Sequence, residues 1–201
     1  MAPMKRHSAL LLAAGGSTRL GRPKQLLSIG GVPLVRHVAR LLLATRPEHL
    51  VVVTGGAEAA IRQALAGLDV VLVRNEDWQT GMASSLRCGH QALAGSSLPL
   101  LIAGTDQPCL TERHLHGLLE QDADGKDVIT SYGEDGRGIP VLLSPATQQR
   151  IQSLQGDTGL RQLWKNMQTA PISVCAPELG FDIDTPEQLD AAVRAGWIDR
   201  D

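Results

Sequence analysis

Length, composition and charge describe one compact domain and exclude several classes of protein. The chain has 201 residues, of which 43% are hydrophobic and 20% charged, enough for one sizeable core and too apolar for a disordered chain. The net charge of -2 and the presence of only one Tyr, one Phe and three Trp argue against a nucleic-acid partner. No apolar run approaches the roughly 18 residues of a membrane span, so no membrane partner is expected.

Cys88, Cys109 and Cys175 include no Cys-x-x-Cys pair, so their spacing favours neither a disulfide framework nor a zinc site. We expect three buried, reduced thiols and a cytoplasmic protein. The basic and apolar residues near the N-terminus superficially resemble a signal peptide. The apolar run is short, however, and a glycine-rich loop follows it in place of a cleavage region. We therefore interpret this segment as part of the fold.

Short apolar runs alternate with helical patterns through the first half of the chain. Nearly continuous apolar character predicts buried strands at Ser8–Ala13, Leu50–Val53, Val70–Val73 and Leu98–Ala103. Apolar residues at the 3.6-residue period predict helices between these strands, over residues 34–42, 57–66 and 84–94. Crossovers of this length imply parallel strands with helices on both faces of the sheet.

The second half of the chain is less regular. Val128–Ser131 and Ile139–Leu143 read as two strands joined by a glycine-containing turn at residues 133–136, in a hairpin-like arrangement. Thr185 before Pro186 provides a helix cap, and Gln188 completes a capping box, so a last helix is predicted from Pro186 to near residue 196. We find no internal repeat and no linker, and we predict a single domain over residues 1–201.

The loop after the first strand combines small residues with cations. Gly15 and Gly16 let the backbone approach a ligand closely, and successive N–H groups in such a loop can cradle a phosphate. Arg19, Arg22 and Lys24 then add positive charge over a short stretch. The simpler alternative is a flexible loop with solvated cations. We interpret the loop as a phosphate site.

Two standard phosphate motifs are absent from this loop. The spacing Gly16-x-x-x-x-Gly21 begins like a P-loop, but Arg22-Pro23 intervenes before Lys24, and Gln25 stands where Ser or Thr would bind magnesium. A dinucleotide fingerprint would need Gly-x-Gly-x-x-Gly and an acidic residue about 20 residues later, and neither is present.

Acidic residues follow the fourth strand and precede the last helix. Asp106 leaves an apolar strand, at the sheet edge where ligands of parallel sheets bind. A carboxylate there suits Mg²⁺, which is usually held by one or two carboxylates together with phosphate oxygens. Asp182 and Asp184 share one face if their segment is extended. The alternatives are a turn cap for Asp106 and helix capping for the later pair.

The loop after the third strand, residues 75–86, carries hydroxyl groups next to a predicted helix start. Free hydroxyls and backbone N–H groups in this position suit hydrogen bonds to a sugar or a base. The alternative is that Ser84 simply caps the helix.

Six motifs, taken together, carry a family resemblance over nearly the whole chain. In chain order they are Leu12-Ala13-Ala14-Gly15-x-Ser17-x-Arg19-x-Gly21-x-x-Lys24, Gly81-Met82-x-x-Ser85-Leu86, Asp106-Gln107-Pro108, Gly138-Ile139-Pro140, Gly156-Asp157-x-Gly159-x-Arg161 and Asp182-Ile183-Asp184-Thr185-Pro186. The set resembles the sugar-nucleotide and cofactor nucleotidyltransferases. It is most similar to the molybdenum cofactor nucleotidyltransferase-like group, and within that group to its cytidylyltransferase branch.

The resemblance implies a Rossmann-like, three-layer α/β/α fold with a mostly parallel sheet. It also implies transfer of a nucleoside monophosphate from an NTP to a phosphorylated acceptor, with release of pyrophosphate. Mg²⁺ is the implied cofactor, on Asp106 and Asp184, with Asp182 as the alternative second ligand. The implied nucleotide-binding residues are Ala13, Ala14, Gly15, Gly16, Lys24, Gly81 and Ser85. The residues expected to shape the acceptor pocket are Gly138, Pro140, Gly156 and Asp157.

Lys24, Arg19 and Asp106 are the expected catalytic residues, and the reaction needs no catalytic base. A terminal phosphate monoester has a second pKa near ~6, so it is already an anionic nucleophile at neutral pH. Lys24 and Arg19 would spread the developing charge, while Mg²⁺ on Asp106 and Asp184 would help pyrophosphate to leave.

The identity of both substrates is a further expectation. Ala13-Ala14-Gly15 is similar to the Ala-Ala-Gly form of cytidylyltransferases rather than the Ala-Gly-Gly form of guanylyl enzymes. The additional methyl group would narrow the base pocket, so we expect CTP rather than GTP. The expected acceptor is molybdopterin or the molybdenum cofactor; a sugar phosphate or a polyol phosphate stays open. Transient contact with a molybdoenzyme or its chaperone is implied as well.

Two alternatives from other classes stay open. One is an accessory protein that carries or inserts the molybdenum cofactor without transferring a nucleotide; Arg19, Lys24 and Asp106 argue against it, because a carrier needs no metal–triphosphate clamp. The other is a redox enzyme derived from the same scaffold, which the missing dinucleotide fingerprint disfavours.

Overall fold

A seven-stranded, mostly parallel sheet organises the protein, whose computed structural model describes residues 5–121, 124–133, 136–164 and 170–200. The strand order is β5-β4-β1-β6-β8-β7-β9. The strands are β1 Ser8–Ala13, β4 Leu50–Thr54, β5 Val71–Arg74, β6 Leu100–Gly104, β7 Val128–Ser131, β8 Arg137–Leu143 and β9 Ile172–Cys175. A separate two-stranded hairpin consists of β2 Ser28–Ile29 and β3 Val32–Pro33.

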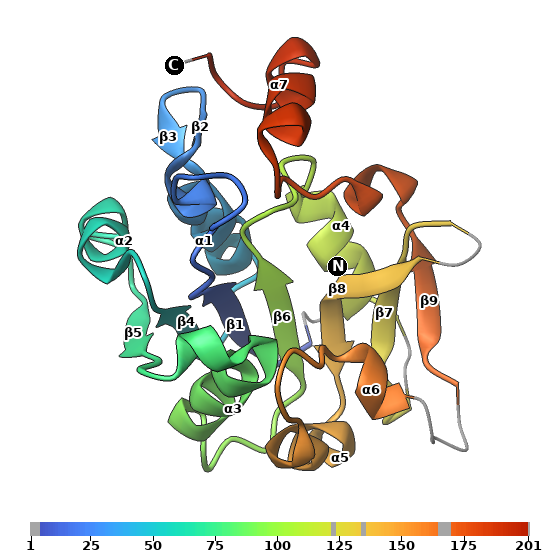
Figure 1. The fold of residues 1–201 in the computed structure, drawn as a ribbon. Helices are drawn as coiled ribbons and strands as arrows, with labels where there is room; N and C mark the ends of the chain where they lie inside the picture. Colours follow the sequence, from blue (N-terminus) through green and yellow to red (C-terminus); the bar gives the residue numbers. More distant parts are fainter. Residues whose placement is uncertain (1–4, 122–123, 134–135, 165–169, 201) are drawn as a thin grey trace.

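Strand direction divides the sheet into two parts (Figure 1). β1 pairs in parallel with β4 and β6, and β4 pairs in parallel with β5. β8 runs antiparallel to both β6 and β7, and β9 is parallel to β7. The predicted hairpin-like excursion is therefore confirmed as β7 and β8. Residues 134 and 135 of its predicted turn lie outside the described residues.

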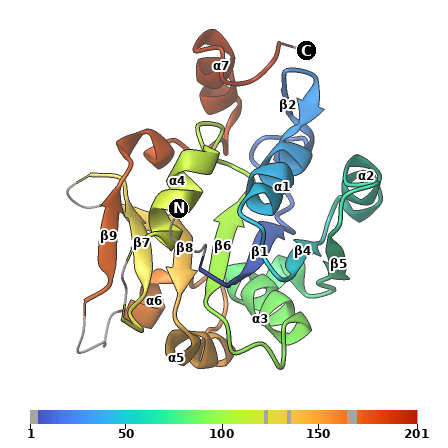
Figure 2. The same ribbon diagram turned by 180° about the vertical axis from the view of Figure 1, so that it is seen from behind.

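Helices cover both faces of the sheet, as predicted (Figures 1 and 2). The helices are α1 Leu34–Ala44, α2 Glu58–Ala64, α3 Met82–Ala92, α4 Glu112–Leu119, α5 Pro145–Gln148, α6 Arg161–Trp164 and α7 Pro186–Arg194. Short 3₁₀ turns are η1 Lys24–Leu26, η2 Trp78–Thr80, η3 Gln149–Ser153 and η4 Pro177–Gly180. In the described part of the chain, no helix is both long and apolar enough to cross a membrane.

The core lies in two layers, one on each side of the sheet. Successive side chains of a strand point to opposite faces, so Leu11 of β1 joins a cluster with α1, and Leu10 joins a second cluster with Leu86 of α3. All three leucines are fully buried, and each such burial contributes roughly 1.5–3 kcal/mol. Burial on both faces explains why this strand has an almost uninterrupted apolar sequence.

Two expectations about burial were wrong. Residues 70–73 were predicted as a buried strand, but β5 is an edge strand paired only with β4, and Val71 is 52% exposed. The cysteines are free but not buried: Cys175 is exposed on the other edge strand, β9, and Cys88 and Cys109 are half-buried. An apolar run shows that a strand forms but does not show how many neighbours cover it.

Side-chain caps mark the start of α7 but not that of α3. The predicted capping box is present: the Thr185 side chain accepts from the N–H of Gln188, and the Gln188 side chain accepts from the N–H of Thr185. α3 begins two residues earlier than predicted, after Gly81, so Ser84 lies inside the helix and does not cap it. Its hydroxyl instead lies 2.8 Å from the carbonyl oxygen of Gly81.

Candidate active site

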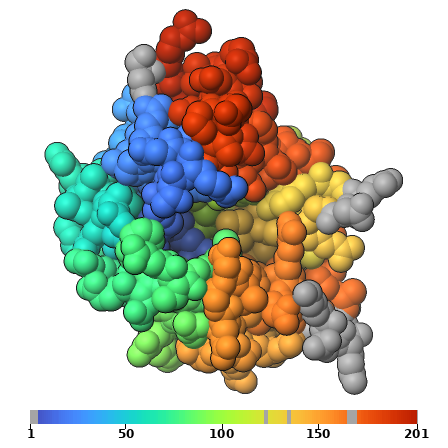
Figure 3. Space-filling view, in the orientation of Figure 1, coloured from blue at the N-terminus to red at the C-terminus, as the bar shows by residue number. Residues whose placement is uncertain are grey.

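A large pocket opens at the carboxyl ends of the parallel strands, where the sequence predicts ligand binding. Its volume is about 770 Å³, and residues 14–19, 78–82 and 104–106 supply most of its lining. Figure 3 shows this face hollowed where the blue N-terminal, green and orange segments meet. Parallel strands present their loops together at this edge, so segments distant in sequence converge here.

Gln25 braces the loop after β1 through two side-chain hydrogen bonds. Its side-chain N–H groups donate to the carbonyl oxygens of Ala13, at 3.1 Å, and Gly15, at 2.7 Å, and the residue is 1% exposed. Ser17 Oγ accepts from the backbone N–H of Lys24 at 3.1 Å, which ties the two ends of the loop together. Sequence reasoning used Gln25 only to reject a P-loop and missed this bracing role.

One ammonium group joins the two distant aspartates. Lys24 Nζ donates to Asp106 Oδ2 at 3.1 Å and to Asp184 Oδ1 at 2.7 Å. Arg19 donates to the other oxygen of Asp184 at 2.9 Å. Lys24 is largely withdrawn from solvent, with 13% of its side chain exposed, whereas Arg19 is 70% exposed. The structure therefore brings together the four charged residues that sequence reasoning assigned to catalysis and metal binding.

The charges of this cluster support one another. Burial disfavours the charged ammonium, but the carboxylates of Asp106 and Asp184 outweigh this effect and raise the pKa of Lys24. Burial would raise the pKa of Asp184 as well, yet the hydrogen bond and charge of Lys24, with Arg19, hold it below its usual value. Lys24 is therefore charged at neutral pH.

The same carboxylates suit a divalent cation. Asp106 Oδ1 is buried and has no hydrogen-bond partner, so one oxygen of this residue is available next to the ion pair. Among the described residues, no group of three or more His, Cys, Asp or Glu is arranged around a metal position. This donor set fits Mg²⁺, which takes one or two carboxylates and completes its shell with phosphate oxygens and water.

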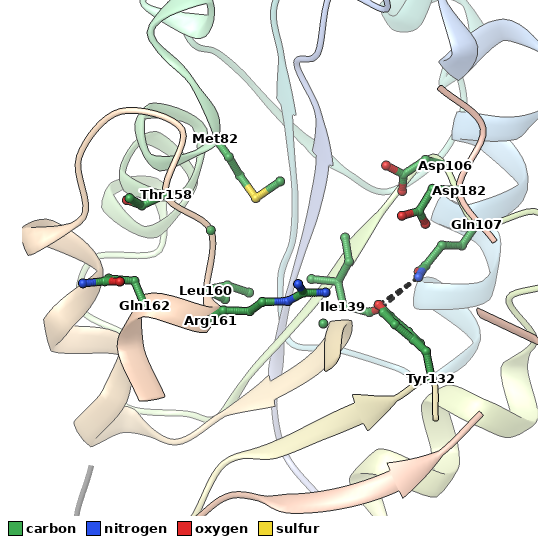
Figure 4. A pocket seen from close by; sticks show the side chains of 12 residues that line it. Met82, Asp106, Gln107, Tyr132, Ile139, Thr158, Leu160, Arg161, Gln162 and Asp182 are labelled. Carbon is green, nitrogen blue, oxygen red and sulfur yellow. Dashed lines mark hydrogen bonds between the residues drawn. The ribbon is translucent and has the colours of Figure 1, made fainter. Parts of the chain in front are cut away.

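A second, smaller pocket adjoins the first. It has a volume of about 410 Å³ and shares Met82, Asp106 and Ile139 with the larger pocket. In Figure 4, Asp106 and Asp182 lie side by side at one end, and Arg161 extends across the pocket towards Ile139. The two pockets therefore meet at Met82, Asp106 and Ile139, and of these three residues only Asp106 is charged.

Asp182 and Asp184, which sequence reasoning treated as alternatives, face different surroundings. Asp184 lines the larger pocket beside Lys24, whereas Asp182 lines the smaller pocket. The side chain of Asp182 keeps access to solvent, but desolvation by the surrounding protein raises its pKa to about 7, and the nearby Asp106 carboxylate adds to the rise. Of the two, only Asp184 shares an ammonium partner with Asp106 in the described structure.

A buried network that sequence reasoning missed supports this junction. Gln107 is 2% exposed, and its side-chain nitrogen lies 3.0 Å from Tyr132 Oη, 3.0 Å from the carbonyl oxygen of Ile139 and 2.7 Å from that of Leu179. The Tyr132 hydroxyl donates to the Ile139 carbonyl, and burial raises the pKa of Tyr132 to about 12. In the sequence, the one available signal for this network was that Tyr132 is the only tyrosine and lies in a glycine-rich stretch.

The other predicted site residues divide between the pockets and the scaffold. Lining the larger pocket are Ala14, Gly15, Gly16, Gly81, Ser85 and Asp157, whereas Gly138 lines the smaller one. Neither lining includes Ala13, Pro140 or Gly156; Ala13 and Pro140 are buried. The Gly156 carbonyl accepts from the N–H of Ala83, and this packing against the start of α3 carries Asp157 to the larger pocket rather than into the smaller one.

Comparison with known proteins identifies relatives of the whole chain. Residues 9–171 match the MobA-like NTP transferase domain. The chain is 34% identical over 193 residues to the nicotine blue oxidoreductase of Paenarthrobacter nicotinovorans, covering 90% of this chain and 94% of that protein. It is 38% identical over 172 residues to the bifunctional protein GlmU of Kineococcus radiotolerans, covering 76% of this chain and 35% of that protein, so it spans about a third of GlmU.

The fold gives the same assignment. Rv0371c from Mycobacterium tuberculosis H37Rv is similar with a TM-score of 0.78 and 25% identity, over 94% of this chain and 99% of that one. The family match spans residues 9–171, which include the loop after β1 and Asp106, and the structural match covers 94% of the chain. The chain therefore belongs to the MobA-like NTP transferase family and has its nucleotidyltransferase fold.

Proposed function

We propose that this protein transfers CMP from CTP to the phosphate of molybdopterin or the molybdenum cofactor, releasing pyrophosphate. The single observation that carries the transferase assignment is the convergence of Lys24, Asp106 and Asp184 at the junction of two pockets. A carrier that inserts the cofactor would need only one of these pockets. The choice of CTP and of the pterin rests on the motif resemblance.

The chain's own residues would bring two anions together. The acceptor's phosphate oxygen forms a bond to the α-phosphorus of the NTP, and the bond to the β-phosphate breaks, with its electron pair leaving on pyrophosphate. Lys24 is held charged between two carboxylates, so it can offset the repulsion between the substrates and the charge that develops on the phosphates. Arg19, which is more exposed, adds a second cation at the mouth of the pocket.

We further propose that Mg²⁺ is the cofactor, held by Asp106 and Asp184. The unpartnered oxygen of Asp106 and the position of both carboxylates on one cation support this choice. When bound, Mg²⁺ would neutralise phosphate charge and favour departure of pyrophosphate. Asp182 faces the smaller pocket, where a carboxyl with a pKa of about 7 would meet the acceptor without a full negative charge.

The acceptor would occupy the smaller pocket. Met82, Ile139 and Leu160 give it apolar walls, and Arg161 supplies one cation. Such a lining favours a compact, largely flat molecule over a polyol, whose hydroxyl groups would need many polar partners. This supports a pterin over a sugar phosphate or a polyol phosphate.

The decisive experiment measures pyrophosphate release for the four NTPs with each candidate acceptor: phosphorylated pterin, sugar phosphate and polyol phosphate. We expect release only with Mg²⁺ present, with CTP and with the pterin. Calorimetry on the same samples tests the carrier alternative, because a carrier would bind the pterin but show no magnesium-dependent binding of CTP. Pyrophosphate release that needs no pterin and occurs with every NTP would overturn the proposed acceptor. It would leave the transferase assignment standing.

A second candidate is a redox reaction on the same scaffold. It is favoured by the match to a protein named as an oxidoreductase over 90% of this chain. The loop after β1 lacks a dinucleotide fingerprint, which argues against it. An absorbance assay can follow the oxidation of reduced nicotinamide cofactors in the presence of pterin or quinoid acceptors. Oxidation that occurs without any NTP would support this candidate.

A further inference from the structure

Trp78 is the only aromatic residue among the described residues that line the larger pocket. It begins η2, in the loop between β5 and α3, and it is half-buried. Asn75 braces this loop: its side-chain nitrogen lies 2.8 Å from Ser84 Oγ and 3.0 Å from Ser85 Oγ, and its Oδ1 accepts from the N–H of Asp77 at 3.0 Å. The backbone that carries the indole is therefore anchored to α3.

Glycines from two other loops make room for the indole. A Cβ added at Gly16, after β1, would lie 2.5 Å from Cζ3 of Trp78, and one at Gly56, after β4, would lie 3.0 Å from Cζ2. A Cβ at Gly55 would lie 2.8 Å from Cγ and also 2.4 Å from the Ala14 carbonyl oxygen. At Gly16 and Gly56 the indole is the only group that would be crowded. The ring thus fills a seat formed by the loops of neighbouring parallel strands.

This seat lies beside the phosphate loop. Gly16 both lines the larger pocket and touches the indole, and the same loop leads to Lys24. A nucleotide whose triphosphate meets Lys24 would direct its base along the pocket, away from the Asp106 end and towards the loops after β4 and β5. A fixed aromatic ring there has the property that a base requires, because every base presents a flat face that stacks on aromatic side chains.

We propose that the base of the nucleotide stacks on the indole of Trp78. The space that Gly16, Gly55 and Gly56 leave for the indole then determines which bases fit the pocket. The inference rests on the proposed nucleotide function of the larger pocket. It also assigns the choice of base to Trp78 rather than to Ala14. Ala14 lines the pocket but is only 3% exposed and belongs to the core cluster beneath it, so its methyl group forms little of the pocket wall. Trp78, half-buried and packed against the same cluster, offers the pocket more surface.

The first test separates base binding from phosphate binding. Calorimetry would compare Mg²⁺-CTP with Mg²⁺-tripolyphosphate, which has phosphates but no base, on wild type and Trp78→Leu. We expect the Kd for CTP to rise at least about 5-fold in the variant, as loss of a base–aromatic stack of about 1–3 kcal/mol requires, while the Kd for tripolyphosphate stays within about twofold. Trp197→Leu is the matched control, because that ring packs against Phe181, away from the pocket.

Fluorescence gives a readout that does not depend on catalysis. CTP should quench the tryptophan emission of wild type and of Trp197→Leu but not that of Trp78→Leu, since stacking acts on the indole itself. A merely structural role for Trp78 predicts equal weakening of CTP and tripolyphosphate binding, and this result would overturn the proposal.

The second test adds a methyl group next to the indole of Trp78. Gly56→Ala should press the indole into the pocket and weaken purine nucleotides more than pyrimidine nucleotides; Trp78→Leu in the same chain should abolish that difference. If wild type binds tripolyphosphate and CTP but Trp78→Leu changes neither, the stacking inference fails and the proposed function stands. If wild type binds no NTP and no tripolyphosphate, both fail.

Discussion

The proposed transfer reaction depends on two single charges, those of Lys24 and Asp106. Lys24→Ala removes the ammonium that both aspartates contact, and Asp106→Ala removes the carboxylate with the unpartnered oxygen. We expect each variant to lower kcat by about 10²–10³-fold, or about 3–4 kcal/mol of transition-state stabilisation, with an unchanged circular dichroism spectrum. Arg113→Ala, an exposed change on α4, is the control. Near-normal turnover of both variants would remove these assignments.

The raised pKa of Asp182 predicts that the stability of the protein depends on pH. Its pKa of about 7 in the folded state exceeds the ordinary 3.8, so ionisation costs the folded state free energy that the unfolded chain does not lose. This cost is absent below pH 3.8, grows as pH rises and is complete above about pH 7. Asp182→Asn removes the cost.

We therefore expect Asp182→Asn to stabilise the protein at pH 8 and to have little effect at pH 4. Urea unfolding with a chelator present, so that no metal contributes, measures the difference in unfolding free energy. Asp190→Asn, an exposed change on α7, should show no such trend. A difference that is the same at both pH values would show that Asp182 does not titrate in this range.

At the scale of elements, Asp127 joins β7 to two helices. It is 1% exposed; one side-chain oxygen accepts from the N–H of Ser144, which caps α5, at 2.8 Å, and the other accepts from the indole N–H of Trp164 in α6 at 2.7 Å. Asp127→Ala leaves the buried N–H of Ser144 and the part-buried indole N–H of Trp164 unpaired, so we expect a loss of about 2–4 kcal/mol in unfolding free energy by urea titration. Asp69→Ala, which is exposed, should change it by less than about 0.5 kcal/mol.

Elements were predictable where the local pattern was strong. β1, β4 and β6 are buried on both faces and therefore have continuous apolar sequences, and α7 carries its own capping box. β9 was missed because a half-covered edge strand, with alternating half-buried and exposed residues, carries little apolar signal. α6 has only four residues, too few for a helical period to appear.

At the scale of the whole molecule, the topology of the sheet explains why part of the site could be predicted from the sequence. Lys24 and Asp106 belong to motifs in the segments that follow β1 and β6, and the parallel topology brings the carboxyl ends of these strands together. Asp184 belongs to the motif just before α7, and it meets them through Lys24. Gln107 and Tyr132 meet through β6 and the β7–β8 hairpin, a contact that depends on antiparallel pairing and carries no local signal. Trp78 was likewise unrecognised, because its role depends on glycines after two other strands.

The same convergence makes ligand binding a property of the entire fold. Asp106 follows β6, Asp184 precedes α7 and Lys24 lies in η1, so a ligand that contacts all three joins the segments after β1 and β6 to the start of the last helix. A ligand that binds only the folded state at 100 times its Kd adds about 2.7 kcal/mol of stability. For a domain of this size, Mg²⁺-CTP should therefore raise Tm by about 5–10 °C in one cooperative transition seen by calorimetry. Lys24→Ala should abolish the shift, and CTP with a chelator should give little of it. Two transitions, of which only one moved with ligand, would show instead that the pocket belongs to one half of the molecule.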